Sequence, residues 1–342
     1  MSLREIAEEA GVSITTVSRV INNTALHKVS EDTRQRVLEI ARTRRFRPNR
    51  QAVSLASRRP PNTIGLVMPY HSHVFDSFYF SQIACAVADV ATAHDMDVNL
   101  LVSREARSGG YLDFLSGQRV AGAILMGTEM GDEIVPHARA AEVPFIVINN
   151  NVPIPGVDVV TCNNGAGAWE MTRHLAKLGH TRIGFIAGPV RLLDAHDRLD
   201  GYRQALVEAC LCDDDELIAN GNFNEKDGRE AMRRLLSLDR RPTAVFAAND
   251  ESAIGAMQVL KREGMRVPDD MAVVGFDDIP LAQYIDPALT TVHQPFYRLG
   301  ETAAELLIAR IRGEAPSEAD AHHVIRTRLV IRESCGGRSV RI

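Results

Sequence analysis

The stretch from Ser13 to Asn22 carries side chains that can contact a nucleic acid. Hydroxyls and amides can bond phosphate oxygens, and an arginine can bond the edge of a guanine through two hydrogen bonds. Such groups reach the bases when they lie on the first turns of a helix in the major groove. We expect DNA contacts from the hydroxyl, guanidinium, amide and exposed apolar side chains of this stretch, namely Ser13, Ile14, Thr15, Thr16, Ser18, Arg19 and Asn22.

Two short helices are predicted to position these side chains. Ser2 and Glu5 have the spacing of a capping box, so the first helix should begin at Leu3. Gly11 can turn the chain with a positive φ, and Ser13 can cap the second helix. Helix, short turn and helix form a helix-turn-helix, although a helical hairpin without a partner has the same pattern. The apolar residues predicted to face inward are Leu3, Ile6, Ala7, Ala10, Val17, Val20 and Ile21.

A third amphipathic helix is predicted from Ser30 to Arg44, with Val37, Leu38 and Ala41 facing inward. The chain continues with RPNRQAVSLAS, residues 47–57. The motif AxxAGVSxxTVSRVIN, this third helix and the motif PNRQAxSLA make the chain resemble the LacI/GalR family of bacterial regulators. The resemblance continues to the C-terminus. It implies a DNA-binding head on a body that binds a small-molecule effector.

A short hinge helix is predicted from Arg50 to Ser57, started by Pro48 and Asn49, with Asn49 as its cap. A helix this short is unstable alone in water, so it needs a second copy or DNA beside it. The resemblance implies that paired hinge helices enter the minor groove, where Leu55 wedges between base pairs beside the small Ala52. The alternative is a disordered linker with incidental apolar residues. The RRPP run at 58–61 ends any helix and marks a domain boundary.

Charge is divided unevenly along the chain. Residues 1–59 hold 12 Lys and Arg against 6 Asp and Glu, whereas the remaining residues hold 27 against 38. A basic first part suits a polyanionic partner for that part alone. The N-terminus lacks the pattern of a signal segment and no apolar run approaches membrane-spanning length, so we expect a cytoplasmic protein.

The cysteines and histidines give no sign of a disulfide framework or a metal centre. Five cysteines are an odd number, which does not suggest a set of paired disulfides. Cys210 and Cys212 lack a second pair of ligands, and His322 and His323 are isolated in the sequence. We therefore expect no metal and no cofactor.

The body from Thr63 onward alternates apolar strands with amphipathic helices, which predicts an α/β fold with parallel sheets covered by helices. One helix is predicted from Asp197 to Ala209, and one late strand from Val324 to Arg332. The resemblance implies a two-lobed, periplasmic-binding-protein-like core. The predicted domains are a helix-turn-helix at 1–47, a hinge at 48–62 and an effector-binding and dimerisation domain at 63–342, with an N-subdomain of about 63–161 plus 294–320 and a C-subdomain of about 162–293 plus 321–335.

Polar and aromatic side chains follow the predicted strands of the body, where open α/β sheets bind ligands. The resemblance implies that Arg198, Asn249 and Asp277 hydrogen-bond the effector and that Phe223 packs on it. A carboxylate, a guanidinium and an aromatic face together suit a sugar. The alternative is that Asp250 and Asp278 only cap helices and that Asn150 only sets a turn. The full set of candidate effector-binding residues is Tyr79, Phe80, Asn149, Asp194, Arg198, Phe223, Asn249 and Asp277.

Two positions depart from the purine-responsive members of the family. Those relatives carry an Arg and a Thr upstream of the residue that matches Arg198, whereas this chain has Leu192 and Asp194 there. A purine effector is therefore not expected, and the acidic Asp194 suits a hydroxyl-rich ligand.

Two other classes of protein were weighed against a regulator. The segment Asn164–Trp169 begins like a dinucleotide-binding fingerprint, but Glu170 stands where the third glycine is needed. A sugar-binding transport protein would not need the basic head. We therefore predict a DNA-binding transcriptional regulator, a repressor that binds a palindromic operator as a homodimer under the control of a sugar-like effector. The sequence leaves open whether the effector releases or promotes DNA binding.

Overall fold

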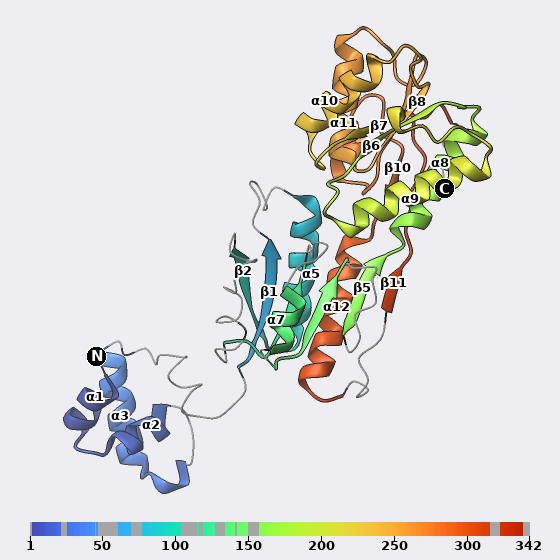
Figure 1. Cartoon of the computed structure of the whole chain (residues 1–342). Coiled ribbons are helices and arrows are strands. Elements are labelled where there is room, and N and C mark those ends of the chain that lie inside the picture. Colours follow the sequence, from blue (N-terminus) through green and yellow to red (C-terminus); the bar gives the residue numbers. More distant parts are fainter. Residues whose placement is uncertain are drawn as a thin grey trace. The chain divides into compact units, whose positions relative to one another are not determined.

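The computed structural model describes residues 2–21, 26–44, 46, 61–69, 77–103, 115, 119–126, 134–140, 142–149, 157–314 and 322–337. Two compact units make up the chain, one from Met1 to Pro61 and the other from Asn62 to Ile342 (Figure 1). The predicted hinge helix, with Ala52 and Leu55, lies outside the described residues, as do Asn22 and Asn150.

The first unit is a helix-turn-helix, as predicted. Ser2 and Glu5 form the capping box: Ser2 Oγ accepts from the Glu5 N–H at 3.3 Å, and the Ser2 N–H donates to Glu5 Oε2 at 2.8 Å. Gly11 ends the first helix with φ 64°. Ser13 Oγ then accepts from the N–H of Thr16 at 3.1 Å and caps the second helix. The helices are α1 Leu3–Ala10, α2 Ile14–Ile21, the 3-10 helix η1 Leu26–Lys28, and α3 Glu31–Thr43.

The core of this unit differs from the prediction at Leu38, which is 43% exposed. Val37 and Ala41, one turn apart on α3, define the buried face of that helix. Leu38 is one residue, or about 100°, further round the helix, which carries its side chain away from this face. The buried residues of the core are Ile6, Ala7, Ala10, Val17, Val20, Val37 and Ala41.

The second unit begins with a sheet of six parallel strands, which with its helices is called the first lobe. Its strands β3 to β5 are buried almost throughout, as expected of a parallel sheet covered on both faces. In spatial order the strands are β11 His322–Ile325, β5 Asp158–Cys162, β4 Phe145–Ile148, β3 Gly122–Leu125, β1 Thr63–Pro69 and β2 Asp97–Ser103.

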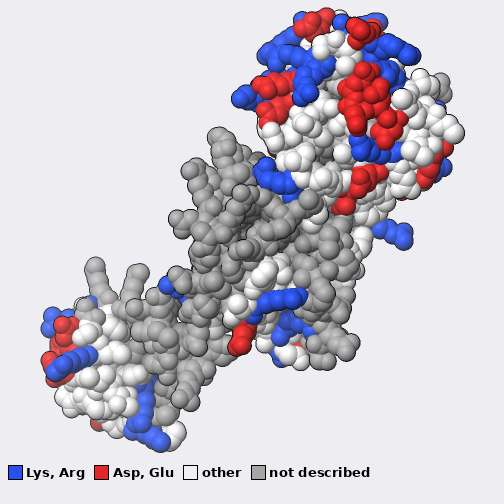
Figure 2. Space-filling view, viewed as in Figure 1, with Lys and Arg blue, Asp and Glu red and all other residues white. Residues whose placement is uncertain are grey.

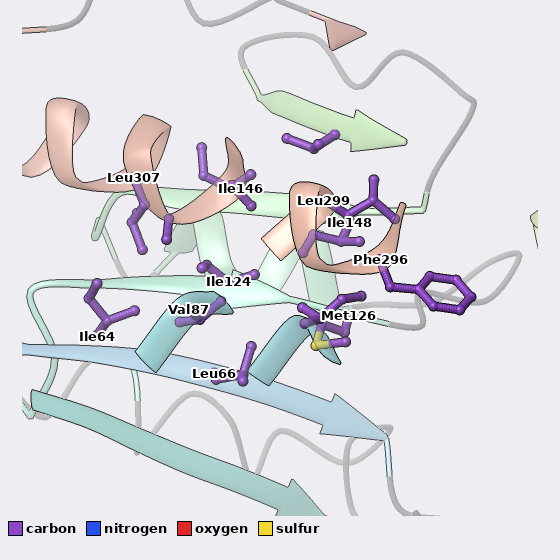
Figure 3. Close-up of a cluster of buried hydrophobic side chains, with 14 of the residues drawn as sticks. Ile64, Leu66, Val87, Ile124, Met126, Ile146, Ile148, Phe296, Leu299 and Leu307 are labelled. Atoms are coloured by element: carbon purple, nitrogen blue, oxygen red, sulfur yellow. The ribbon is translucent and has the colours of Figure 1, made fainter. Parts of the chain in front are cut away.

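The main core of the first lobe lies between the sheet and the helices α5 Phe78–Ala93 and α12 Phe296–Ile311. Figure 3 shows the side chains of Val87 from α5 and of Leu299 and Leu307 from α12 pointing toward the strands. A second apolar cluster includes Ala138 of α7 Ile134–Ala140.

The second lobe is built on a sheet of four parallel strands with helices on both faces. One face packs against α8 and α9 through an aromatic cluster that includes Phe185 and Tyr202, whose ring centroids lie 4.7 Å apart. The other face packs against α10 and α11. The strands in spatial order are β7 Ile218–Asn220, β6 Ile183–Ala187, β8 Ala244–Ala247 and β9 Ala272–Val274, and the helices are α8 Asn164–Lys177, α9 Leu193–Glu208, α10 Glu225–Leu236 and α11 Asp250–Arg262, with 3-10 turns η4 Asp215–Leu217 and η5 Pro280–Gln283.

The prediction of a single late strand from Val324 to Arg332 is wrong. This part of the chain forms two strands, β11 and β12 Arg328–Val330. Strand β11 pairs with β5 in the first lobe, whereas β12 pairs antiparallel with β10 Thr291–His293. Residues 322–325 therefore belong to the first sheet and not to the predicted C-subdomain segment 321–335. A chain that passes between two sheets must leave one ladder before it joins the next, which is why the one predicted strand is two strands.

Helix α9 begins at Leu193, four residues before the predicted start at Asp197. The earlier start places Asp194 in the first turn, where a carboxylate interacts favourably with the helix dipole. Arg198 then follows one turn later on the same face, so the two side chains can pair. Among the described residues, the structure contains no helix that is both long and apolar enough to cross a membrane.

Candidate ligand site and nucleic-acid interface

The first turns of α2 present the side chains predicted to contact DNA. Ser13 and Thr15 are exposed, and Ile14 is 48% exposed although it is apolar. Thr16 is half-buried, and its Oγ1 shares a 2.9 Å hydrogen bond with Ser13 Oγ. The cap therefore holds two of the predicted hydroxyls in a fixed arrangement, while Ile14 and Thr15 extend from the helix.

Arg19 lies in the last turn of α2 and is half-buried, as is Ser18. Other arginines of this unit are paired, since Arg4 contacts Glu8 at 3.3 Å and Arg44 contacts Glu9 at 3.2 Å. Arg19 makes no ion pair with any carboxylate in the described part of the chain. Figure 2 shows Lys and Arg side chains on the visible face of this unit. The unpaired guanidinium is available to an anionic or acceptor-bearing partner.

Arg198 is the centre of the candidate ligand site in the second lobe. Its side chain is 3% exposed and projects from α9. Nε donates to Asn164 Oδ1 at 3.1 Å, and Nη1 donates to the carbonyl of Ala248 at 2.5 Å. Two carboxylates flank the guanidinium, Asp194 at 3.4 Å from Nη2 and Asp277 at 3.5 Å from Nη1. Buried charges are tolerated when they are paired and hydrogen-bonded in this way.

Aromatic rings pack beside the Arg198 guanidinium. The central carbon of the guanidinium, Cζ, lies 4.2 Å from the ring centroid of Phe276 and 5.2 Å from that of Phe223. Phe223 follows β7 and has φ 55°, an unusual backbone conformation for a residue with a side chain. A Cβ at Gly188 would lie 2.3 Å from the Phe223 ring. The glycine after β6 thus makes room for the aromatic side chain that the sequence predicted at the site.

Asp277 follows β9 and adopts φ 120°. Gln294 Nε2 donates to Asp277 Oδ1 at 2.6 Å, and the Asp277 N–H donates to the carbonyl of Val292. Burial raises the pKa of the Asp277 carboxyl to about 7, against the opposing effects of Arg198 and Gln294. The carboxyl can therefore accept or donate a hydrogen bond near neutral pH.

The Asn249 side chain holds two neighbouring segments of backbone in place. Its Oδ1 accepts from the Ser252 N–H at 3.0 Å and caps α11, while its Nδ2 donates to the carbonyl of Phe223 at 3.0 Å. These bonds use the amide oxygen and one amide hydrogen. The side chain predicted to bind effector directly thus also fixes the position of Phe223.

The neighbouring carboxylates Asp250 and Asp278 do not cap helices, contrary to the alternative considered from the sequence. Asp250 is fully buried and accepts from the Thr291 hydroxyl at 2.5 Å and from the N–H of Ile279 at 2.9 Å. Asp278 pairs with His293 at 2.9 Å and with Arg332 at 2.6 Å. Burial acts to raise the pKa of Asp278, but these two partners bring it below its ordinary value. Both carboxylates tie the end of β9 to neighbouring segments.

In the first lobe, Tyr79 and Asn149 form a hydrogen-bonded pair. Asn149 Nδ2 donates to the Tyr79 hydroxyl at 3.1 Å, while Asn149 Oδ1 is buried and has no partner in the described part of the chain. Burial raises the pKa of Tyr79, with a smaller contribution in the same direction from Asp194 of the second lobe. Phe80 instead belongs to the hydrophobic core, with 8% exposure and its ring 4.8 Å from that of Tyr79. Its structural role is to support Tyr79.

Sequence analysis missed three residues of this arrangement. Asn164 is fully buried and accepts from Arg198, although the sequence offered it only as part of a glycine-rich segment. Gln294 bonds Asp277 and has a buried Oε1 with no partner among the described residues. Phe276 supplies the nearer of the two aromatic rings. Of these, only Phe276 had a local signal, because it directly precedes Asp277 at the end of a strand.

Comparison with known proteins places the two units in known domain families. Residues 2–49 match the model described as bacterial regulatory proteins, lacI family, and residues 172–335 match the periplasmic binding protein-like domain. The regulator CelR of Thermobifida fusca is 35% identical, covering 97% of this chain and 98% of that protein. The repressor PurR of Vibrio cholerae is 33% identical over 91% of each chain, and CytR of Escherichia coli is 33% identical over 92% of this chain and 90% of that one.

Solved structures agree with this comparison. A complex of CelR with cellobiose superposes with a TM-score of 0.75 at 34% identity, covering 98% of this chain and 99% of that one. The lac repressor dimer bound to operator and the anti-inducer ONPF gives a TM-score of 0.81 at 28% identity, with the same coverage.

A helix-turn-helix followed by a periplasmic-binding-protein-like body defines a DNA-binding transcriptional regulator controlled by a small molecule. The chain belongs to the LacI family of bacterial transcriptional regulators.

Proposed function

We propose that this protein is a sugar-responsive repressor that binds a palindromic operator as a homodimer in the cytoplasm. The observation that carries the effector assignment is the cluster of Arg198, Asp194 and Asp277 beside Phe223. Carboxylates accept hydrogen bonds from hydroxyls, and an aromatic face covers the C–H side of a sugar ring. The relative CelR was solved with cellobiose, which supports a carbohydrate.

The proposed effector-binding residues are Tyr79 and Asn149 from the first lobe and Asp194, Arg198, Phe223 and Asp277 from the second. Asn149 Oδ1 needs a donor, which a sugar hydroxyl can provide. Asn249 and Phe80 support these residues through the Phe223 carbonyl and the Tyr79 ring.

A purine effector is the second candidate, because PurR of Vibrio cholerae is 33% identical. Positions 192 and 194 argue against it. Leu192 precedes α9 and brings no hydrogen-bonding side chain, and Asp194 is paired with Arg198. We therefore favour a sugar over a nucleobase.

The proposed DNA contacts are Ser13, Ile14, Thr15, Thr16, Ser18, Arg19 and Asn22 of the head, and Ala52 and Leu55 of the hinge. The exposed Ile14 and Thr15 support the assignment of the head, as does Arg19, which has no ion pair among the described residues. The operator-bound dimer of the lac repressor supports a dimer that binds DNA. The relatives named above are transcriptional regulators, which supports a protein with no enzymatic activity.

A thermal-shift screen of the full-length protein tests the effector class. Sugars and nucleobases are compared at the same concentration. We expect a sugar to raise the melting temperature, since a ligand that binds only the folded state stabilises it by mass action. A response confined to purines would overturn the sugar assignment.

A further inference from the structure

We propose that the effector of this protein is an uncharged, hydroxyl-rich sugar and that the site rejects phosphorylated and carboxylated sugars. This inference rests on the proposed function and narrows its ligand class. It follows from the charges, the helix termini and the hydrogen-bonding atoms of the described residues at the site.

The positive charge of the site is already balanced by acidic groups. Two of them, Asp194 and Asp277, lie on the Arg198 guanidinium at 3.4 and 3.5 Å. An anionic group brought to this guanidinium would lie beside the Asp194 carboxylate, which carries a like charge, in a partly dehydrated site.

Each nitrogen of the guanidinium already has a protein partner. Nε is bonded to Asn164, Nη1 to the Ala248 carbonyl and Nη2 to Asp194, while Asp277 lies 3.5 Å from Nη1. A phosphate or carboxylate needs a guanidinium with two parallel N–H groups to form its preferred bidentate contact. To offer such a pair, Arg198 would have to give up a buried carboxylate, which would then lose its partner.

The helices that follow the strands of the second lobe have acidic residues of the protein itself in their first turns. Helix N-termini bind anions through free N–H groups and the helix dipole. Here α9 after β6 carries Asp194 in its first turn, α10 after β7 carries Glu225 and Asp227, and α11 after β8 carries Asp250 and Glu251. In α9 and α10 these carboxylates offset the positive ends of the helix dipoles.

Two acceptor oxygens near the site lack a donor in the described part of the chain. Asn149 Oδ1 and Gln294 Oε1 are buried without a partner among the described residues. The Gln294 amide is oriented by its Nε2, which donates to Asp277. Hydroxyl groups donate to such oxygens, whereas phosphate and carboxylate oxygens only accept. These two oxygens are therefore complementary to a ligand that brings O–H donors, and they would repel an anionic oxygen.

The test compares matched sugars that differ in charge. Full-length protein is titrated by calorimetry with glucose, glucose 6-phosphate and glucuronate, with galactose and galacturonate, with ribose and ribose 5-phosphate, and with cellobiose. We expect binding by one or more neutral sugars and at least tenfold weaker binding by each charged counterpart, about the effect of one unfavourable charge near a protein surface. A charged sugar that binds more tightly than its neutral parent overturns the inference and leaves the sugar-responsive function standing. No binding by any of these sugars, in a protein that still binds operator, would count against the sugar assignment itself.

A variant of Asp194 tests whether its negative charge makes the site prefer neutral over charged sugars. Asp194→Asn keeps the shape of the side chain and removes one charge, so the affinity ratio of neutral to charged sugar should fall about tenfold. The control is Asp200→Asn, the same change on the same helix at an exposed position. We expect the control to leave the ratio unchanged. An unchanged ratio in Asp194→Asn, or an equal change in both variants, contradicts the inference.

Discussion

Arg19 in the helix-turn-helix and Arg198 in the second lobe carry the same charge in opposite settings. Arg19 is half-buried on a short helix and has no ion pair in the described part of the chain, whereas Arg198 is 3% exposed with a carboxylate on either side. An unpaired surface cation keeps its attraction for a polyanion. A buried cation whose charge is balanced orients neighbouring acceptors and favours a neutral ligand. The difference indicates that the protein recognises DNA through an arginine that is free to pair with it, and the effector through an arginine whose charge is already balanced.

The largest effect is expected from Arg198→Ala. Removal of the guanidinium leaves Asp194 and Asp277 without their cationic partner, and breaking a buried pair in this way typically costs about 3–5 kcal/mol. Urea denaturation should show this loss of stability, together with loss of effector binding. The control is Arg173→Ala, which removes an exposed arginine that stacks on Trp169 and should cost about 1 kcal/mol or less. Equal losses in the two variants would mean that the Arg198 cluster does not stabilise the lobe.

The next effect is the pH dependence of stability that comes from Asp277. Its pKa is raised to about 7 in the folded protein, so between about pH 4 and 7 the folded state holds a proton that the unfolded state has lost. The contribution of this group to stability is therefore largest at low pH and falls as the pH rises through that window. Asp277→Asn cannot titrate, so the difference in unfolding free energy between variant and wild type should grow in favour of the variant from pH 5 to 7. A difference that stays constant with pH would contradict the raised pKa.

Arg19→Ala should leave the folded state almost unchanged and act on DNA binding. A bidentate arginine–guanine contact is worth about 1–3 kcal/mol of discrimination. Operator affinity should therefore fall about tenfold or more, with a smaller loss on random DNA at the same salt concentration. Arg36→Ala is the charge-matched control because Arg36 is exposed on α3. Equal losses on operator and random DNA in Arg19→Ala would limit Arg19 to phosphate contacts.

Much of the fold could be predicted because local signals and the global structure agree. The capping box of Ser2 and Glu5, the φ 64° turn at Gly11 and the alternation of strands and helices all depend on residues near one another in sequence. The errors occur where tertiary context decides. Leu38 is apolar but lies off the buried face, and the segment from Val324 to Arg332 is divided between two sheets.

The candidate site was predictable in its residues and not in its hydrogen bonds. Phe223 and Asp277 follow strands, and Arg198 lies on the helix after β6, so all three could be found from the pattern and the family resemblance. Asn164 and Gln294 could not, because their roles depend on contacts with residues 34 and 17 positions away in the chain. Sequence separation of that size leaves no local periodicity to detect.

We propose that the effector site and the DNA-binding head are coupled through one allosteric equilibrium. A ligand can shift that equilibrium only by binding one of its states more tightly than the other, and typical couplings are about 1–3 kcal/mol. Linkage is reciprocal, so operator must change effector affinity by the same factor as effector changes operator affinity. The direct measurement is calorimetric titration of the sugar identified by the screen into the protein alone, with operator, and with a scrambled duplex of equal length. We expect operator alone to change the sugar affinity about five- to 150-fold, weakening it for an inducer and strengthening it for a corepressor. Identical sugar affinities in all three titrations would show that the two sites are uncoupled and that the protein is not a ligand-controlled switch.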